Sequence, residues 1–339
     1  MSGSRLPRLD YLVGSIILTA IVLGLGWGII YYYAILPLVQ EGPVRLAEMA
    51  KLPVTSAIWW RHLIALGFDV LVIVIGVVGT WWVTANLLRE APEAGKWRIY
   101  YKSEEGRHDV WVEKLTVWQR FQHFWVLLTF TICAITGFAM MGHVLADRQT
   151  LMLIHVTSGI AMGALMLVHA IYYGGKLLAA KARGEPLRER FPMLDIYSRR
   201  FLRSVVRVLL GKSPEPYDKY DVEQLFEYWG VYWGMLVLGI PGVIMLLYGN
   251  QVLGGILWTT HVKEAVLAVT FILMVHLGYT HFRPKIFPMD PTWLYGKVPL
   301  RRILEEHPRW AERLKKLGIV REEAARPAPK PAEAEARSQ

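Results

Sequence analysis

Apolar residues occur in six long stretches along the chain, separated by segments rich in charged and polar residues. Each stretch holds about 20 residues, the length that an α-helix needs to cross a hydrocarbon core of roughly 30 Å. The six stretches lie near residues 11–33, 62–85, 118–141, 151–174, 225–248 and 257–280. The first is too long for the core of a signal peptide and has no small-residue cleavage site, so we expect it to be retained. The pattern predicts an all-α integral membrane protein with six transmembrane helices.

Composition agrees with this interpretation, and the distribution of charge predicts how the chain is oriented in the membrane. Hydrophobic residues make up 54% of the 339 residues, and the formal net charge is +10. Lys and Arg concentrate in 86–117, in 175–222 and after 280, which a six-span path places on one side of a membrane. Positive residues accumulate on the cytoplasmic side, so this excess is a topology signal and does not indicate binding of nucleic acid. We therefore expect a multi-pass protein of the cytoplasmic (inner) membrane with both termini in the cytoplasm.

The chain divides into an N-terminal hairpin and a four-helix core. The predicted parts are a transmembrane hairpin (1–90), a cytoplasmic connector (91–114), the core (115–295) with its basic cytoplasmic loop (175–222), and a cytoplasmic tail (296–339). In the basic loop, "IYSRRFLRSVVRVLLGK" places apolar residues between arginines at roughly helical spacing. This spacing predicts an amphipathic helix on anionic lipid headgroups. The end of the tail, "EEAARPAPKPAEAEARSQ", is rich in Pro, Ala and charge, and we expect it to be disordered.

Cysteine content limits the redox chemistry that this chain can carry. The sequence has one cysteine, Cys133, inside the third span. A single cysteine excludes a disulfide framework, a c-type haem attachment motif and an iron–sulfur site within the chain. Any such centre must belong to a partner.

Histidines cluster in the last four spans, where an ionisable side chain is costly and usually faces the interior of a helix bundle. The six are His123, His155, His169, His261, His276 and His281. His155 and His169 are fourteen residues apart, and His261 and His276 are fifteen apart, so each pair lies on broadly one helix face with roughly 21–23 Å between its members.

The predicted topology sorts these histidines by depth. His155 and His261 begin their spans toward the outside, whereas the cytoplasmic ends of the spans hold three others, His123, His169 and His276. We expect His281 at the lipid headgroups, because five residues rotate it about 140° from His276 on an α-helix. His143 lies in a short outer loop, where we expect it to be solvated.

The chemistry that uses such an arrangement is bis-histidine ligation of b-type haem, with one neutral imidazole from each of two helices. The pattern favours His155 with His261 at the outer level, and His276 with either His169 or His123 at the cytoplasmic level. Small residues would leave room for two flat macrocycles, and the candidates are Gly137, Gly159, Gly163, Gly230 and Gly234. The alternative for each histidine taken alone is a hydrogen bond to a neighbouring helix.

Three segments resemble membrane cytochrome b subunits of formate dehydrogenase, thiosulfate reductase and nickel–iron hydrogenase. "WQRFQHFWVLLTFTICAITGF" resembles their first core helix, and "DKYDVEQLFEYWGVYWGMLVLGIPG" is similar to the entry into their third. "HVKEAVLAVTFILMVHLGYTHFRPKIFPMD" is similar to the last core helix of variants that accompany multihaem c-type cytochromes. The resemblance covers about 115–295. It implies a di-haem subunit that reacts with quinone, with His123 and His276 on the cytoplasmic haem and His155 and His261 on the outer haem.

Quinone chemistry takes two electrons and two protons, so its site needs groups that relay protons near one haem. At the cytoplasmic level, the candidates are Asp221, Glu223, Glu227 and Tyr228, although acids at a helix start and aromatic residues in an interfacial belt are also ordinary features. Glu264 is a second candidate on the outer side, with an ion pair to Lys263 as the alternative. Arg120 would bind either a haem propionate or a lipid phosphate.

The sequence thus predicts an electron-transfer subunit of an oxidoreductase complex, with two b-type haems and quinone or quinol as substrate. Its expected partners are membrane lipid, quinone, and an extracytoplasmic redox subunit such as a multihaem cytochrome c or an iron–sulfur protein. Two other classes fit six spans with histidines. One is a transporter with a histidine proton relay, and the other is a membrane anchor that carries no electrons.

Overall fold

The computed structural model describes residues 8–320, so the Pro- and Ala-rich end of the predicted tail lies outside the described residues. Within this range the protein is nearly all-α and has six helices long and apolar enough to cross a membrane. Each of the six predicted spans lies inside one of them. The expected fold class is confirmed, and the chain is a multi-pass membrane protein.

Three of the six membrane helices contain π-helical turns, and the sixth begins with a kinked segment in which Leu253 and Gly254 have positive φ. The first comprises α1 (Leu9–Ile30), the π-turn η1 (Tyr31–Ile35) and α2 (Leu36–Met49), and the second comprises α3 (Ala57–Glu90) and η2 (Ala91–Glu93). The third and fourth are α6 (Val117–Gly142) and α7 (Arg148–Ala182). The fifth comprises α10 (Val222–Gly234), the π-turn η4 (Met235–Gly239) and α11 (Ile240–Tyr248), and the sixth comprises η5 (Val252–Gly255), α12 (Ile256–Phe271) and the π-helical η6 (Ile272–His281).

Side-chain caps fix where three of these helices begin. The Thr116 hydroxyl accepts a hydrogen bond from the Gln119 backbone N–H, and the Gln119 side chain accepts one from the Thr116 N–H, which is a capping box at the start of α6. Asp147 caps α7 and Asp221 caps α10. Each carboxylate satisfies backbone N–H groups that have no partner within the first helical turn.

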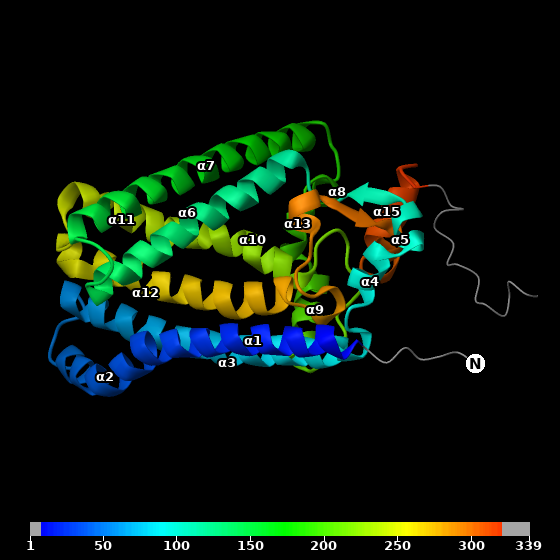
Figure 1. Cartoon of the computed structure of the whole chain (residues 1–339). Helices are drawn as coiled ribbons and strands as arrows, with labels where there is room; N and C mark the ends of the chain where they lie inside the picture. The colour runs from blue at the N-terminus through cyan, green and yellow to red at the C-terminus, as the bar shows by residue number, and fades with distance from the viewer. Residues whose placement is uncertain (1–7, 321–339) are drawn as a thin grey trace, which may run out of the picture.

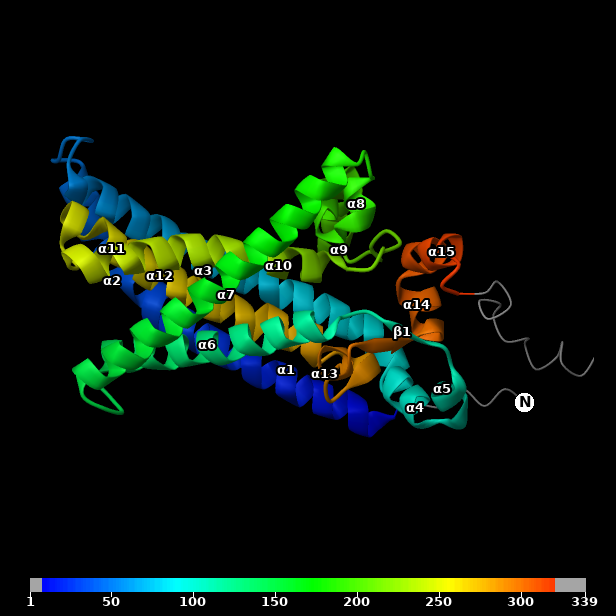
Figure 2. The same ribbon diagram turned by 90° about the horizontal axis from the view of Figure 1, so that it is seen from above.

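The sixth helix lies in the middle of the bundle. Figure 1 shows α12 between α1 and α3 on one side and α6, α7 and α10 on the other, and Figure 2 shows the same bundle from above. The N-terminal hairpin and the sixth helix share a buried cluster that includes Ile30, Val72, Val266 and Met274. The approach is close, because a side chain at Gly26 would overlap Met274. The hairpin therefore packs directly on the helix that carries His261 and His276.

A buried ion pair also joins the hairpin to the sixth helix. Asp69 of α3 is fully buried and pairs with Lys263 of α12, and Arg45 Nη1 of α2 lies 3.5 Å from its Oδ2. The Lys263 ammonium also donates to the Tyr33 carbonyl of the π-turn η1 at 3.0 Å. Removing one partner would leave an uncompensated buried charge, which is strongly destabilising.

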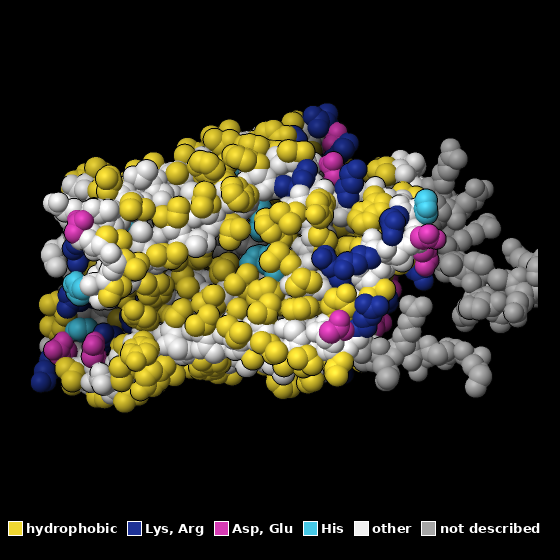
Figure 3. Space-filling view, viewed as in Figure 1, with side chains coloured by type: hydrophobic (Ala, Val, Ile, Leu, Met, Phe, Trp, Pro, Cys, Tyr) yellow, Lys and Arg dark blue, Asp and Glu magenta, His cyan; other side chains and the backbone are white. Residues whose placement is uncertain are grey.

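The two ends of the bundle differ in how much chain they carry. The far end holds only the loops 50–56, 143–147 and 249–251, whereas the basic end holds 91–116, 183–221 and 282–320. Its elements are α4 (Lys96–Lys102), α5 (Glu104–His108), β1 (Trp111–Glu113), α8 (Leu187–Arg190), η3 (Pro192–Tyr197), α9 (Arg199–Leu209), η7 (Pro284–Ile286), α13 (Thr292–Tyr295), β2 (Lys297–Pro299), α14 (Leu300–Glu306) and α15 (Pro308–Lys316). Charged side chains gather toward both ends of a largely hydrophobic surface (Figure 3). The amphipathic helix predicted in the basic loop is α9, and its contact with headgroups stays a prediction.

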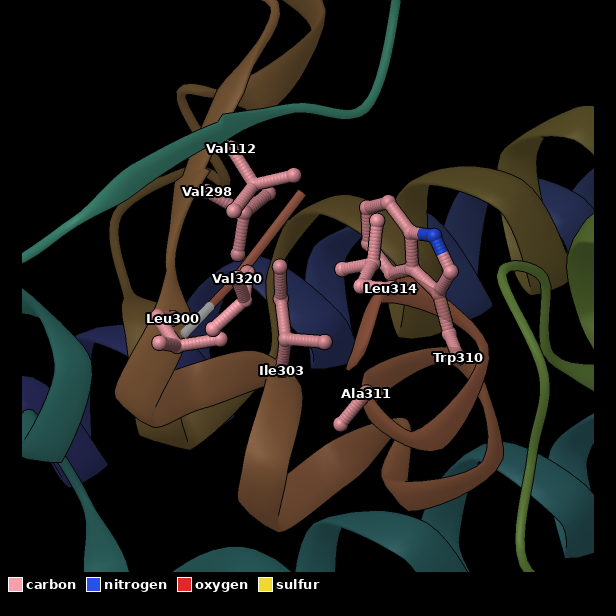
Figure 4. Close-up of a cluster of buried hydrophobic side chains, with 8 residues drawn as sticks. All are labelled: Val112, Val298, Leu300, Ile303, Trp310, Ala311, Leu314 and Val320. Atoms are coloured by element: carbon pink, nitrogen blue, oxygen red, sulfur yellow. The ribbon is translucent and has the colours of Figure 1, made fainter. Parts of the chain in front are cut away.

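A small folded cap covers part of the basic end. Strands β1 and β2 pair antiparallel, with Val112 opposite Val298, and α14 and α15 follow β2 directly. Their apolar side chains form one buried cluster, drawn in Figure 4: Val112, Val298, Leu300, Ile303, Trp310, Ala311, Leu314 and Val320. The predicted connector and the described part of the predicted tail therefore fold together.

Candidate functional site

At the far end, two histidines from different helices face each other. His155 of α7 and His261 of α12 have ring centroids 6.0 Å apart. His155 Nδ1 lies 3.0 Å from Thr136 Oγ1, and this hydroxyl donates its own hydrogen to the Ile132 carbonyl at 2.7 Å. His261 Nδ1 lies 2.9 Å from the Leu238 carbonyl oxygen, which can only accept. Both partners therefore assign the ring hydrogen to Nδ1 and leave the Nε2 lone pair of each imidazole available as a ligand.

Glycines keep space open beside both of these rings. A Cβ at Gly137 of α6 would lie 3.4 Å from His155 Cε1, and one at Gly242 of α11 would lie 3.5 Å from His261 Cε1. Gly137 was among the glycines predicted to make room, and it is the only one of those five whose added Cβ would come within 4 Å of a described histidine. Gly242 was missed, although it directly follows Pro241, where the sequence already departs from a regular helix.

At the basic end, three histidines gather. His123 of α6 and His276 and His281 of η6 each offer a ring nitrogen, and these nitrogens all lie within 4.8 Å of one another. His276 Nε2 is 3.0 Å from His281 Nε2, and the His123 and His276 ring centroids are 6.1 Å apart. Trp293 of α13 lies beside His123, with ring centroids 5.6 Å apart.

The prediction for His281 was wrong. We expected it at the headgroups, but it is buried and faces His276. The reason is that residues 272–281 are π-helical, so hydrogen bonds run between residues five apart and bring positions i and i+5 toward one face. The expected rotation of about 140° applies only to an α-helix.

Glu227 of α10 lies beside the Nδ1 side of His276, at ion-pair distance. The distance between His276 Nδ1 and Glu227 Oε2 is 3.0 Å, and Glu227 Oε1 accepts from the Thr280 hydroxyl at 2.7 Å. A carboxylate this close to an imidazole stabilises positive charge on the ring and raises its basicity. Glu227, predicted as a proton-relaying acid, thus contacts a candidate ligand directly.

His169 lies outside the three-histidine cluster. Its Nε2 is 3.0 Å from the Tyr228 hydroxyl, and its ring lies against Tyr173 with centroids 4.4 Å apart. Tyr232 completes this aromatic group, with its hydroxyl 3.5 Å from that of Tyr228. Of the two histidines that competed for His276, the structure places His123 beside it and His169 beside Tyr228.

A cavity of about 560 Å³ runs between the core helices and reaches the basic end. This volume lies within the range of small-molecule and cofactor pockets. The cavity wall includes five histidines and many apolar side chains of α6, α7 and α12; the histidines are His123, His169, His276, His281 and His307. In Figure 3, histidine side chains are visible in a hollow of the apolar surface.

The deeper part of the cavity contains a buried carboxyl group. Glu264 is only 3% exposed, and its Oε2 has no hydrogen-bond partner within residues 8–320. The alternative of an ion pair with Lys263 is not what the structure contains, because Lys263 pairs with Asp69. Glu264 instead lines the cavity one turn from His261.

The remaining predicted residues lie at the basic end. Asp221 is buried in the cavity wall and accepts from the Gln224 N–H at 2.9 Å, and burial raises the pKa of its carboxyl group. The guanidinium of Arg120 donates to the Leu294 carbonyl, and Arg120 is not among the cavity-lining residues. Lys114 and His307, which no sequence pattern indicated, do line the cavity and contact each other.

The arrangement provides two sets of imidazoles at two depths, and the cavity is lined by the basic-end set. The far-end pair offers two neutral Nε2 atoms from facing helices, and the basic-end set brings imidazoles of α6 and η6 together, which suits metal centres of the haem type. In comparisons with known proteins, no family model, curated protein or solved structure matches the chain. The chemistry of the site must therefore be argued from its own geometry.

Proposed function

We propose that this protein is a membrane di-haem cytochrome b of the kind that its sequence resembles, and that it exchanges electrons between quinone and a redox partner. The observation that carries the proposal is the far-end pair, His155 and His261. Each ring donates its Nδ1 hydrogen to an uncharged acceptor, and the two rings face each other between α7 and α12, so both Nε2 atoms are available as ligands. This is the arrangement of an axial histidine with its outer hydrogen bond.

Two haems would be held at two depths. His155 and His261 would hold one, and His276 with His123 would hold the other. Bound haem would supply one-electron iron chemistry, while the chain's own residues orient the imidazoles through Thr136, the Leu238 carbonyl and Glu227. Gly137 and Gly242 support the same assignment, because a larger residue at either position would narrow the space beside a ring.

Quinone would react near the basic-end haem. Tyr228 and His169 form a hydrogen-bonded pair in the cavity wall, next in sequence to the Glu227 that holds His276. A hydroxyl and an imidazole are suitable groups for hydrogen-bonding a quinone oxygen and for passing it a proton. Asp221, at the start of the same helix, would receive protons from the basic end. Glu264 is the alternative acid, at the deeper end of the cavity.

The distribution of charge gives the proposed orientation of the protein in the membrane, and the two haem depths give the side that would face the redox partner. The basic end would face the cytoplasm, as the positive-inside rule requires, and both termini would lie there. The far end, with its short loops, would then face the redox partner, which we expect to be a multihaem cytochrome c or an iron–sulfur protein.

The decisive experiment is an optical spectrum of the full-length protein purified in detergent. We expect a b-type α-band in the reduced-minus-oxidised difference and two haems per chain in a pyridine haemochrome assay. Protein that is monodisperse but has no b-type band would contradict the proposal.

A proton-relay transporter is the second candidate. It is favoured by Glu264, a buried membrane carboxyl with an oxygen that has no hydrogen-bond partner in the described chain. The same spectrum separates the two classes, because a transporter of this kind needs no haem. In that case, proton uptake by protein in liposomes should depend on Glu264 and persist in haem-free protein.

A further inference from the structure

Lys114 is a buried cation at the basic end of the cavity. It lies between β1 and α6 and is 6% exposed. Its Nζ is 3.3 Å from His307 Nε2, and His307 Nδ1 is 2.7 Å from the Asp218 carbonyl oxygen. Because the carbonyl can only accept, His307 carries its hydrogen on Nδ1 and accepts from Lys114 with Nε2. The lysine thus keeps two further N–H donors for another partner.

Comparison with Arg302 shows what Lys114 lacks. These two are the buried Lys and Arg residues within residues 8–320. Arg302 donates to Asp290 and to Glu306, each at 2.7 Å. Lys114 has no carboxylate oxygen within 4.0 Å among the described residues, and burial lowers its pKa to about 8 although the charge of Asp221 opposes this shift. A buried ammonium with no carboxylate in direct contact is costly, so a ligand that places an anionic oxygen against it would be favoured.

The shape of the cavity defines the kind of ligand. Lys114 and His307 line its polar end, while His123 and His276 lie in the same wall further along, followed by apolar side chains such as Phe130. A molecule that fills this space would therefore have a large apolar body, reach the histidines, and carry an anionic oxygen at the basic end.

We infer that Lys114 binds a carboxylate of the tetrapyrrole held at His276, that is, a propionate of the basic-end haem, and that His307 positions the lysine. This inference rests on the proposed function. A carboxylate accepts charge-assisted hydrogen bonds from an ammonium, which are about twice as strong as neutral ones. The folded cap is then part of the binding site, because β1 leads into Lys114 and the turn between α14 and α15 supplies His307.

The test compares haem with haem dimethyl ester, whose two propionates carry no charge. Full-length apoprotein with His155→Ala, which is expected to keep only the basic-end site, is titrated with each compound in detergent. With Lys114 present, we expect esterification to weaken binding by about tenfold to a hundredfold, the size of a charge-assisted hydrogen bond. With Lys114→Met added, haem should bind as weakly as the ester, and esterification should have no further effect.

Matched variants separate binding from folding. Lys219→Met removes another cation of the basic end, one that lies near the Trp310 ring and does not line the cavity, and it should keep the preference for haem. His307→Gln can still accept from Lys114 and should keep the preference, whereas His307→Leu should lose it.

Each other result overturns the inference in a recognisable way. If the Lys114 protein binds haem and its ester equally well, no propionate contacts Lys114, and the proposed function stands. If Lys114→Met weakens both compounds equally while esterification still matters, the lysine supports only the fold. If wild-type protein binds no haem at all, the proposed function fails and this inference fails with it.

Discussion

The two histidine sites are built on different principles. The far-end pair consists of two imidazoles, each held by one uncharged acceptor on a neighbouring membrane helix. The basic-end cluster has three imidazoles, a carboxylate on His276, and a folded cap that places Lys114 and His307 in the same cavity. The far-end site therefore depends on helix packing alone, whereas the basic-end site also depends on charge and on chain outside the membrane helices.

This difference indicates separate tasks for the two sites. A pair whose direct hydrogen-bond partners are uncharged suits electron passage with little proton coupling. A cluster beside Glu227, Tyr228 and Asp221 has ionisable groups and a route toward the basic end, as quinone chemistry requires. Substitutions at the two sites should therefore have different consequences.

Removing a far-end ligand should eliminate one haem and leave the other. We expect His261→Ala to reduce the haem count from two to one, because a bis-histidine site cannot keep its second axial bond with one ligand missing. The pyridine haemochrome assay measures this count. His143→Ala is the matched control, since His143 lies beyond the end of α6 and should leave both haems in place. An unchanged count of two haems in His261→Ala would show that His261 is not a ligand and would contradict the far-end assignment.

At the basic end, we expect substitutions of His123, His169 and His281 to have different effects on haem binding. We expect His123→Ala to lose the basic-end haem and His169→Ala to keep it, because His123 lies beside His276 whereas His169 lies beside Tyr228. His281 follows His276 on the same helix and cannot approach a flat macrocycle from the opposite face. His281→Ala should therefore retain two haems, with a change confined to the spectrum of one. Loss of haem in His281→Ala but not in His123→Ala would reverse this assignment.

Helix positions were predictable because each span is a long apolar run, and length alone then fixes the number of crossings. The pairing of His155 with His261 followed from the predicted topology, which placed both at the outer ends of their spans, and both lie on regular α-helix. The prediction for His281 was wrong because its rotation was calculated for an α-helix. No feature of the surrounding sequence indicated that ten residues there are π-helical.

The parts that sequence reasoning missed are those assembled from distant segments. Lys114 and His307 are 193 residues apart and meet only because β1 pairs with β2. The Lys263 ammonium was considered as a partner for Glu264, yet it pairs with Asp69 of the N-terminal hairpin. Such contacts depend on tertiary packing, which periodicity along one segment does not encode.

The smallest effects should come from the hydrogen-bond partners of the ligands, and they should differ in kind between the two sites. Thr136→Val removes the acceptor for His155 Nδ1–H, so we expect the far-end haem to bind about 10–100-fold more weakly.

Glu227→Gln, in contrast, keeps an acceptor near His276 but removes a negative charge. That charge increases electron donation by the imidazole and so stabilises the oxidised iron. Its loss should therefore raise the midpoint potential of the basic-end haem in a redox titration, while the far-end potential stays unchanged. If Thr136→Val and Glu227→Gln instead altered affinity and potential alike at both haems, the contrast between an uncharged and a charged site would not hold.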